Sequence, residues 1–95
     1  VADEPIKLRL KCVPVTQTGL VLPEGWEPEP STEYLKFPSE IIPVKGMEIK
    51  KINFYLNFPK DEKYRNKKYM FIVEAAVEGE LIRTTYRSKI YVKTK

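Results

Sequence analysis

Strict alternation of apolar and polar side chains marks the first part of the chain. From Ile6 to Cys12 every second residue is apolar, and the residues between them are Lys, Arg and Lys. Because successive side chains of a strand point to opposite faces, this pattern predicts a half-buried strand with its cations in solvent. Cys12 falls on the apolar face, where we expect it to act as a small core residue.

The segment 14–38 differs in composition and shows no regular alternation. A short apolar piece at 20–22 is followed by Pro-Glu-Gly-Trp-Glu-Pro-Glu-Pro at 23–30. This density of proline excludes a helix or a central strand. We therefore expect an extended surface loop, from which Trp26 either plugs the edge of the core or stays exposed for a partner.

Two short strands are expected at 34–37 and 41–44, and Pro43 confines the second to a sheet edge. A turn follows, in which Gly46 can supply a positive φ. The strongest alternation comes next, with apolar residues at 52, 54, 56 and 58. It predicts a strand that crosses the middle of a sheet and ends at Pro59.

Residues 69–77 carry hydrophobic side chains on both faces. One face holds the larger set, which includes Phe71 and Val73, and the opposite face holds Met70 and Ile72. After a turn signal around Gly79, the chain from 81 to 95 is expected to hold one more strand with a bulged or kinked lead-in.

No segment shows sustained apolar spacing of the helical kind, whereas strand signals recur about every ten residues with Pro and Gly between them. The predicted fold is all-β, an immunoglobulin-like antiparallel sandwich of about seven strands. We expect residues 1–95 to form a single domain, because so short a chain has no room for a second core.

The composition argues against catalysis. The chain has no His and one Cys, so the commonest general base, metal ligand and triad partner is missing. The close carboxylates fall in predicted turns or at the N-terminus, where solvation keeps pKa values ordinary. The glycines are isolated and form no phosphate-binding loop. We expect no catalytic residue, no metal ion and no cofactor.

The formal net charge is +4, with 17 cations scattered among 13 carboxylates. We expect these mixed charges to form an ordinary solvated surface. Aromatic residues do stand beside cations at 64–65, 86–87 and 91–93, which keeps a nucleic-acid or anionic-polymer binder open as an alternative. No apolar stretch approaches the ~20 residues of a membrane helix, so we expect no membrane insertion. The abundance of Lys and Glu is a hint of a thermophilic source.

Several motifs in the second half carry a family resemblance: Phe-Pro-Ser-Glu-Ile at 37–41, Val-Lys-Gly at 44–46, the alternating run ending at Pro59, and Asn-Lys-Lys-Tyr-Met-Phe-Ile-Val at 66–73. The chain from about Trp26 to Val77 resembles extracytoplasmic immunoglobulin-like accessory domains such as the NPCBM-associated family. It is more loosely similar to major sperm protein and PapD-like sandwiches. These motifs describe how a sandwich turns its corners.

The resemblance implies a spacer, stalk or partner-binding role in a secreted, periplasmic or surface protein. It also implies a corner tyrosine, Tyr69 or else Tyr64, whose ring packs in the core while its hydroxyl bonds to backbone. Asn66 stands where glycine is common in such families, at a position that tolerates left-handed geometry.

Two candidate binding sites follow from the strand assignments. If Phe71 and Val73 face the core, Met70 and Ile72 emerge on the outer face, and Tyr91 of the last strand can join them. The predicted partner interface is Met70, Ile72 and Tyr91 ringed by Arg87, Lys89 and Lys93. The alternative is that these are ordinary scattered surface hydrophobes with no binding role.

The second candidate is the edge strand with Ile41, Ile42 and Val44, which could accept a partner strand as PapD-like chaperones do. The function expected from the sequence is a non-enzymatic module that contacts a protein partner or a neighbouring domain.

Overall fold

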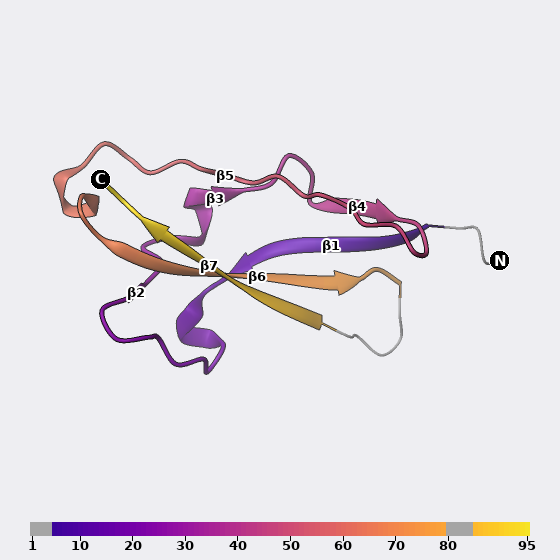
Figure 1. Cartoon of the computed structure of the whole chain (residues 1–95), viewed down its shortest axis with the longest axis horizontal. Coiled ribbons are helices and arrows are strands. Elements are labelled where there is room, and N and C mark those ends of the chain that lie inside the picture. The colour runs from indigo at the N-terminus through magenta and orange to yellow at the C-terminus, as the bar shows by residue number, and fades with distance from the viewer. Residues whose placement is uncertain (1–4, 80–84) are drawn as a thin grey trace.

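The computed structural model describes residues 5–79 and 85–95. Strands dominate these residues, and the helical segments among them are single 3-10 turns (Figure 1). The strands are β1 (Ile6–Val13), β2 (Glu27–Pro28), β3 (Leu35–Lys36), β4 (Ile41–Val44), β5 (Tyr55–Leu56), β6 (Lys68–Val77) and β7 (Thr85–Lys93). The 3-10 turns are η1 (Val15–Gln17), η2 (Thr32–Tyr34) and η3 (Glu62–Tyr64). The fold is all-β, as the alternation predicted.

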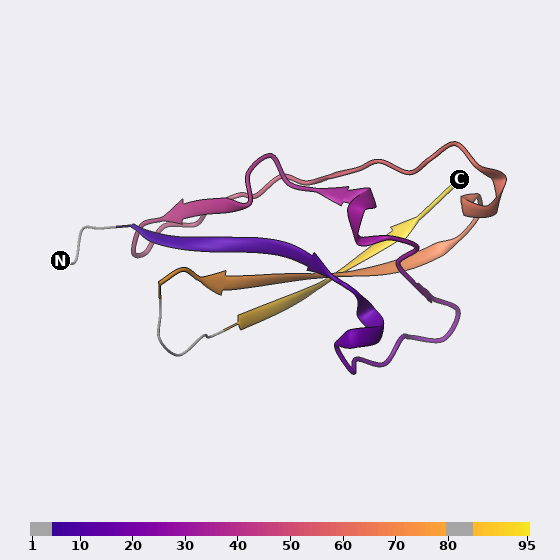
Figure 2. The same ribbon diagram turned by 180° about the vertical axis from the view of Figure 1, so that it is seen from behind.

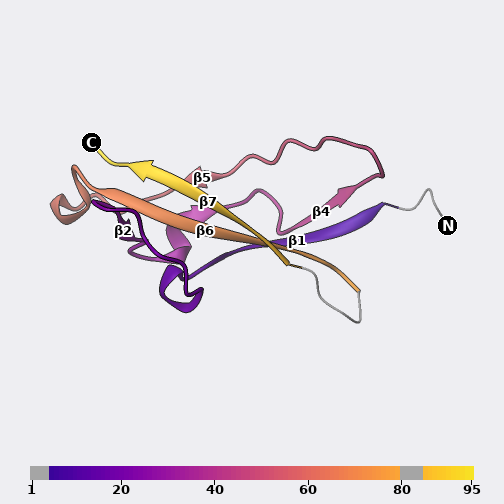
Figure 3. The ribbon, with the colours of Figure 1, turned by 60° about the horizontal axis from the view of Figure 1, so that its bottom comes forward.

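Strand β6 is the centre of the main sheet. β7 pairs antiparallel with it along 68–76, and β1 pairs antiparallel with its other side along 72–77. β2 continues that second side in parallel at Tyr69 and Met70, and β4 pairs with the far side of β1. The order across the sheet is therefore β7-β6-β1-β4, with β7 crossing β6 obliquely in projection as the sheet twists (Figures 1 and 3). β3 and β5 form a separate two-stranded sheet.

No helix in the described ranges is long and apolar enough to cross a membrane.

The two faces of β6 are buried in different ways. Its inner face contributes Tyr69, Phe71 and Val73 to a cluster with Leu35, and Phe58 packs on this cluster from the second layer. Its outer face contributes Met70 and Ile72, which pack with Val15 and the partly buried side chains of residues 13, 20 and 22. Strand β6 is thus the one element whose two faces both lie in a core of the described structure.

The predicted exposure of Met70 and Ile72 is therefore wrong: both side chains are 0% exposed. After β1 the chain turns at Pro14 and lays η1 and the following loop across the outer face, below β6 in Figure 2. The hydroxyl of Thr18 donates to the carbonyl of Val15 at 2.7 Å and fixes this loop. The apolar residues of the loop provide the cover that the alternation in β6 requires.

The predicted central strand around residues 52–58 is also wrong. Only Tyr55 and Leu56 have strand geometry there, and they pair with the two residues of β3 at the surface of the molecule. Phe54 stays 41% exposed, whereas Phe58 is partly buried against the inner cluster. Alternation correctly marked the inward side of this segment, but β3 supplies too short a partner for a longer ladder.

Two positions were predicted to allow a positive φ, and the structure differs from the prediction at one of them. The positive φ after β4 belongs to Met47 (65°) and not to Gly46. Asn66 does take the left-handed conformation that was expected of it, with a φ of 54°.

The molecule is elongated, with extents of 52 × 26 × 19 Å. Its radius of gyration is 15.4 Å, whereas a compact chain of this length has about 12 Å. The two sheets meet around Phe58 and do not close over the other half of the main sheet. Part of the inner face of β6 and β7 consequently borders a groove.

Candidate partner-binding site

Strand β7 is an open edge of the main sheet. In the described ranges it pairs with β6 alone, and the amide of Thr94 donates to the carbonyl of Lys67 at 2.9 Å. With the register that pairs Lys93 with Lys68, this bond sets the alternation of the antiparallel ladder. The backbone groups of residues 86, 88, 90 and 92 point to β6, and those of 85, 87, 89, 91 and 93 point away from the sheet.

None of the five outward residues is proline, so each offers both an N–H and a C=O group. These groups make no hydrogen bond to another residue within 5–79 and 85–95. A strand of nine residues with such an edge is a template for pairing with a further extended chain.

The side chains of the same outward residues lie on the outer face. By register Arg87 stands beside Glu74, Lys89 beside Ile72 and Tyr91 beside Met70. Of the six residues of the predicted interface, Met70 and Ile72 lie in the outer core, whereas Arg87, Lys89, Tyr91 and Lys93 lie on the surface. The surface half of that prediction forms one continuous row along β7.

An aromatic contact closes one end of this row. The Trp26 ring meets the Tyr91 ring edge-on, with centroids 4.9 Å apart and an interplanar angle of 67°. The ammonium of Lys68 lies 5.8 Å from the centroid of Trp26. Trp26 is partly buried, so the loop neither plugs the core with it nor leaves it free. The Trp26 ring thus enlarges the aromatic surface at Tyr91, and the Lys68 ammonium lies against that surface.

The row is electropositive. β7 carries Arg87, Lys89 and Lys93 and no carboxylate. Arg87 Nε lies 3.3 Å from the Glu74 carboxylate, whose side chain is 15% exposed. No ion pair to Lys89 or Lys93 is present in the described part of the chain. Two ammonium groups are therefore available to a ligand on this face.

The inner side of β7 borders the groove left where the two sheets do not close. Tyr86, Ser88 and Ile90 of β7 line this groove together with Ile52 and Phe54. Tyr86 is 62% exposed and Phe54 41% exposed. A mainly apolar groove on the inner side and a cationic row on the outer side thus flank the same open edge.

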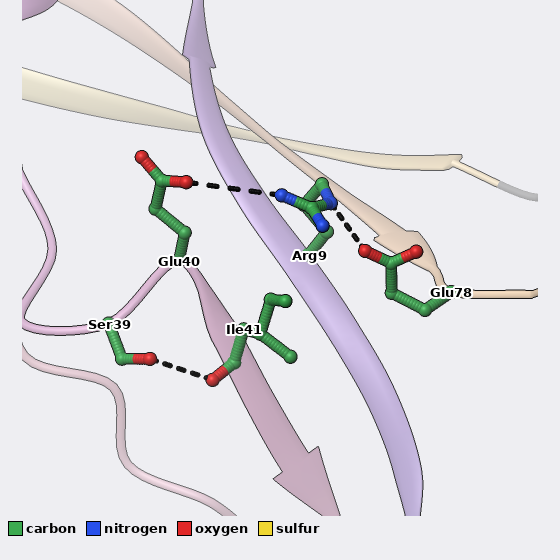
Figure 4. A network of polar contacts seen from close by, with 5 residues as sticks. All are labelled: Arg9, Ser39, Glu40, Ile41 and Glu78. Atoms are coloured by element: carbon green, nitrogen blue, oxygen red, sulfur yellow. Dashed lines mark hydrogen bonds and ion pairs between the residues drawn. The ribbon is translucent and has the colours of Figure 1, made fainter.

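The predicted edge strand, β4, is built differently. It lies at the end of the strand order beside β1, and the amide of Leu10 donates to the carbonyl of Glu40 at 2.7 Å. With the register of Ile6 opposite Val44, this bond turns the backbone of Ile41 and Pro43 outward. Pro43 has no N–H, and the carbonyl of Ile41 already accepts from Ser39 Oγ at 2.8 Å (Figure 4).

Arg9 anchors this end of the sheet. Its guanidinium donates to the carboxylate of Glu78 and lies 3.9 Å from that of Glu40, so it links the ends of β6 and β4 across β1 (Figure 4). The edge with Ile41, Ile42 and Val44 is short, lacks the N–H of Pro43 and has the outward carbonyl of Ile41 already bonded. Its use by a partner strand stays a prediction, and β7 offers more free backbone groups.

The partly buried thiol of Cys12 and carboxyl of Glu29 both favour their protonated forms. Burial, helped by the nearby charge of Glu29, raises the pKa of the Cys12 thiol to about 11. The thiolate, which is the nucleophilic form, is therefore scarce at neutral pH. Burial also raises the pKa of Glu29, against the opposing effect of a hydrogen bond from the Val15 amide. In the described residues no three acidic or Cys side chains gather as a metal site would need.

The corner tyrosines take up a different arrangement from the one the resemblance implies. Tyr69 is buried in the inner cluster, while the hydroxyl of Tyr64 lies 3.1 Å from that of Tyr34. Phe58 packs between these rings. The hydroxyl contact found at this corner thus joins two side chains.

No protein-family model matches the chain, and the searches of curated proteins and of solved structures found no significant similarity.

Proposed function

We propose that this protein is a non-enzymatic protein-binding module with an immunoglobulin-like sandwich architecture, and that it binds through the open edge of β7. The observation that supports this most strongly is the set of outward backbone groups along β7, which have no partner within 5–79 and 85–95. Main-chain hydrogen bonds to such an edge give affinity, and the flanking side chains give specificity. A role outside the cytoplasm, as a spacer or accessory part of a larger protein, is compatible with this proposal.

The proposal is tested with a proline at Lys89. The Lys89 amide points away from β6, so Lys89→Pro removes an outward donor and keeps the ladder bonds to β6. Lys89→Ala is the matched control, because it removes the same charge and keeps the amide. A displayed library of random twelve-residue peptides is panned on the wild-type protein, and binding of the recovered peptides is then measured to both variants.

We expect peptides that bind the wild type, bind Lys89→Ala within a few-fold and lose binding to Lys89→Pro. Circular dichroism of each variant checks that the fold is kept. Equal binding to Lys89→Pro and the wild type, or a library that yields no binder, would contradict the proposal.

A second candidate, nucleic-acid binding, is supported by the Trp26–Tyr91 pair with Lys68 beside it. Aromatic platforms next to cations stack the bases of single strands. A poly-thymidine oligonucleotide should then quench Trp26 fluorescence in low salt and be released steeply as salt rises. Absence of quenching in low salt would refute this candidate.

A further inference from the structure

The surroundings of β7 indicate what kind of segment fits the edge. We propose that the edge accepts an extended protein segment in which apolar and acidic residues alternate, with the apolar side chains in the inner groove and the acidic ones along the outer cationic row. The inference rests on the proposed function and adds the chemistry of the ligand.

The alternation follows from the geometry of a strand. An added strand continues the pleat of β7, so its side chains point in turn to the inner and the outer face of the sheet. On the inner face they reach the groove that Tyr86, Ser88 and Ile90 line together with Phe54. Burial of apolar side chains there removes exposed apolar surface from water. Every second residue of the ligand should accordingly be apolar.

The other residues of the ligand lie on the outer face, next to the row of Arg87, Lys89, Tyr91 and Lys93. Lys89 and Lys93 have no ion pair in the described part of the chain, and residues directly opposite each other on neighbouring strands interact most strongly. Acidic side chains at these positions satisfy both ammonium groups, while basic ones face like charges. The charge of the row therefore selects acidic residues.

The same charges disfavour a second copy of β7 as the occupant. In an antiparallel self-pairing the outward residues of one strand meet those of the other. Centring the pair on Lys89 places Lys89 opposite its own copy, and centring it on Tyr91 places Lys89 opposite Lys93. Any centre from Arg87 to Tyr91 brings two cations together, which is destabilising. Lysines on an edge strand also help to prevent edge-to-edge aggregation. A ligand strand with acidic side chains avoids this repulsion and can pair with the edge.

The experiment uses three fluorescein-labelled nine-residue peptides, acetylated and amidated at their ends. The first alternates Val or Phe with Glu, the second carries Lys in place of each Glu, and the third has the composition of the first with apolar and acidic residues in blocks. Fluorescence anisotropy measures their affinity for the wild-type protein. We expect the alternating acidic peptide to bind at least tenfold more tightly than either of the others and to weaken as salt is raised.

Two variants assign the contacts. Lys89→Glu should weaken the acidic peptide about tenfold and strengthen the Lys peptide, because it exchanges a favourable pair for a like-charge pair. Ser88→Glu adds a charge to the groove wall while its backbone still bonds to β6, and it should weaken the acidic alternating peptide without strengthening the Lys peptide. Circular dichroism confirms that both variants are folded.

The outcomes separate this inference from the proposed function. If the blocked or the Lys peptide binds as well as the alternating acidic one, or if Lys89→Glu leaves the preference unchanged, the ligand chemistry is wrong. Peptides of another composition that still bind the wild type and lose binding to Lys89→Pro would in that case leave the edge-binding function intact.

Discussion

Replacing Ile72 by alanine probes the structural feature on which the binding surface is built. Ile72 lies in the outer core with Val15 and Met70 and is 0% exposed. An Ile→Ala change in a core costs about 2–5 kcal/mol of unfolding free energy. The cover here is η1 and a single loop, which can collapse partly onto the cavity, so we expect about 2–3 kcal/mol. For a chain of this size that lowers the midpoint of thermal unfolding by about 10–20 °C.

The assay is urea unfolding followed by Trp26 fluorescence, since this is the only tryptophan of the chain and its ring packs on Tyr91 of β7. The matched control is Lys89→Ala, which changes the exposed residue directly beside Ile72 on β7 and should alter stability by less than about 0.5 kcal/mol. A loss below about 0.5 kcal/mol for Ile72→Ala would refute the outer core and restore the exposed position that alternation predicted.

Three further substitutions test other parts of the account. Phe58→Ala removes a ring that contacts four aromatic neighbours, and it should lower the free energy of unfolding by about 2–4 kcal/mol in the same assay. A loss below about 1 kcal/mol would contradict the packing of Phe58 on the inner cluster. Met47→Gly should stabilise the fold by up to about 1 kcal/mol, because the fully exposed Met47 has a φ of 65° that glycine adopts without strain. The Cys12 thiol, with its pKa raised from 9.0 to about 11, ionises first in the unfolded chain, so its contribution to stability is complete below pH 9 and is lost as pH rises toward 11. Cys12→Ala should flatten that part of the pH profile, and an identical profile would show that the thiol is not buried.

The strands of the main sheet were largely predictable because their local pattern and their environment agree. The alternation from Ile6 to Cys12 gives β1, and the run 69–77 gives β6. The same reasoning failed at 52–58, where an equally clear alternation has only the short β3 to pair with. Local pattern reports which side of a segment is apolar, whereas ladder length depends on a partner elsewhere in the chain.

The burial of Met70 and Ile72 shows a similar limit. The alternation places hydrophobes on both faces of β6 and identifies no cover for the outer face, so the sequence predicts an exposed patch there. The apolar residues at 13, 15, 20 and 22, from the end of β1 through η1 and the following loop, are the available signal, since they exceed what an exposed segment needs. Their position over β6 depends on the turn after β1, which the local pattern does not specify.

The candidate site was predictable only in part. Alternation indicates which residues of β7 lie on the surface, but the free edge beside them depends on strand order. Edge position is a property of the whole sheet, and lysines at the outward positions are only an indirect sign of it. Pro43 marked the other edge correctly and also removed one of its donors.

Amide hydrogen exchange along β7, measured by NMR on the wild-type protein, tests whether the outward edge of this strand is free. We expect an alternation, with fast exchange at Arg87, Lys89 and Tyr91 and slow exchange at Ser88, Ile90 and Val92, whose amides bond to β6. Addition of the alternating acidic peptide should then slow the fast set and leave the slow set unchanged. Protection of all six amides in the free protein would show that the edge is already covered and would contradict the account.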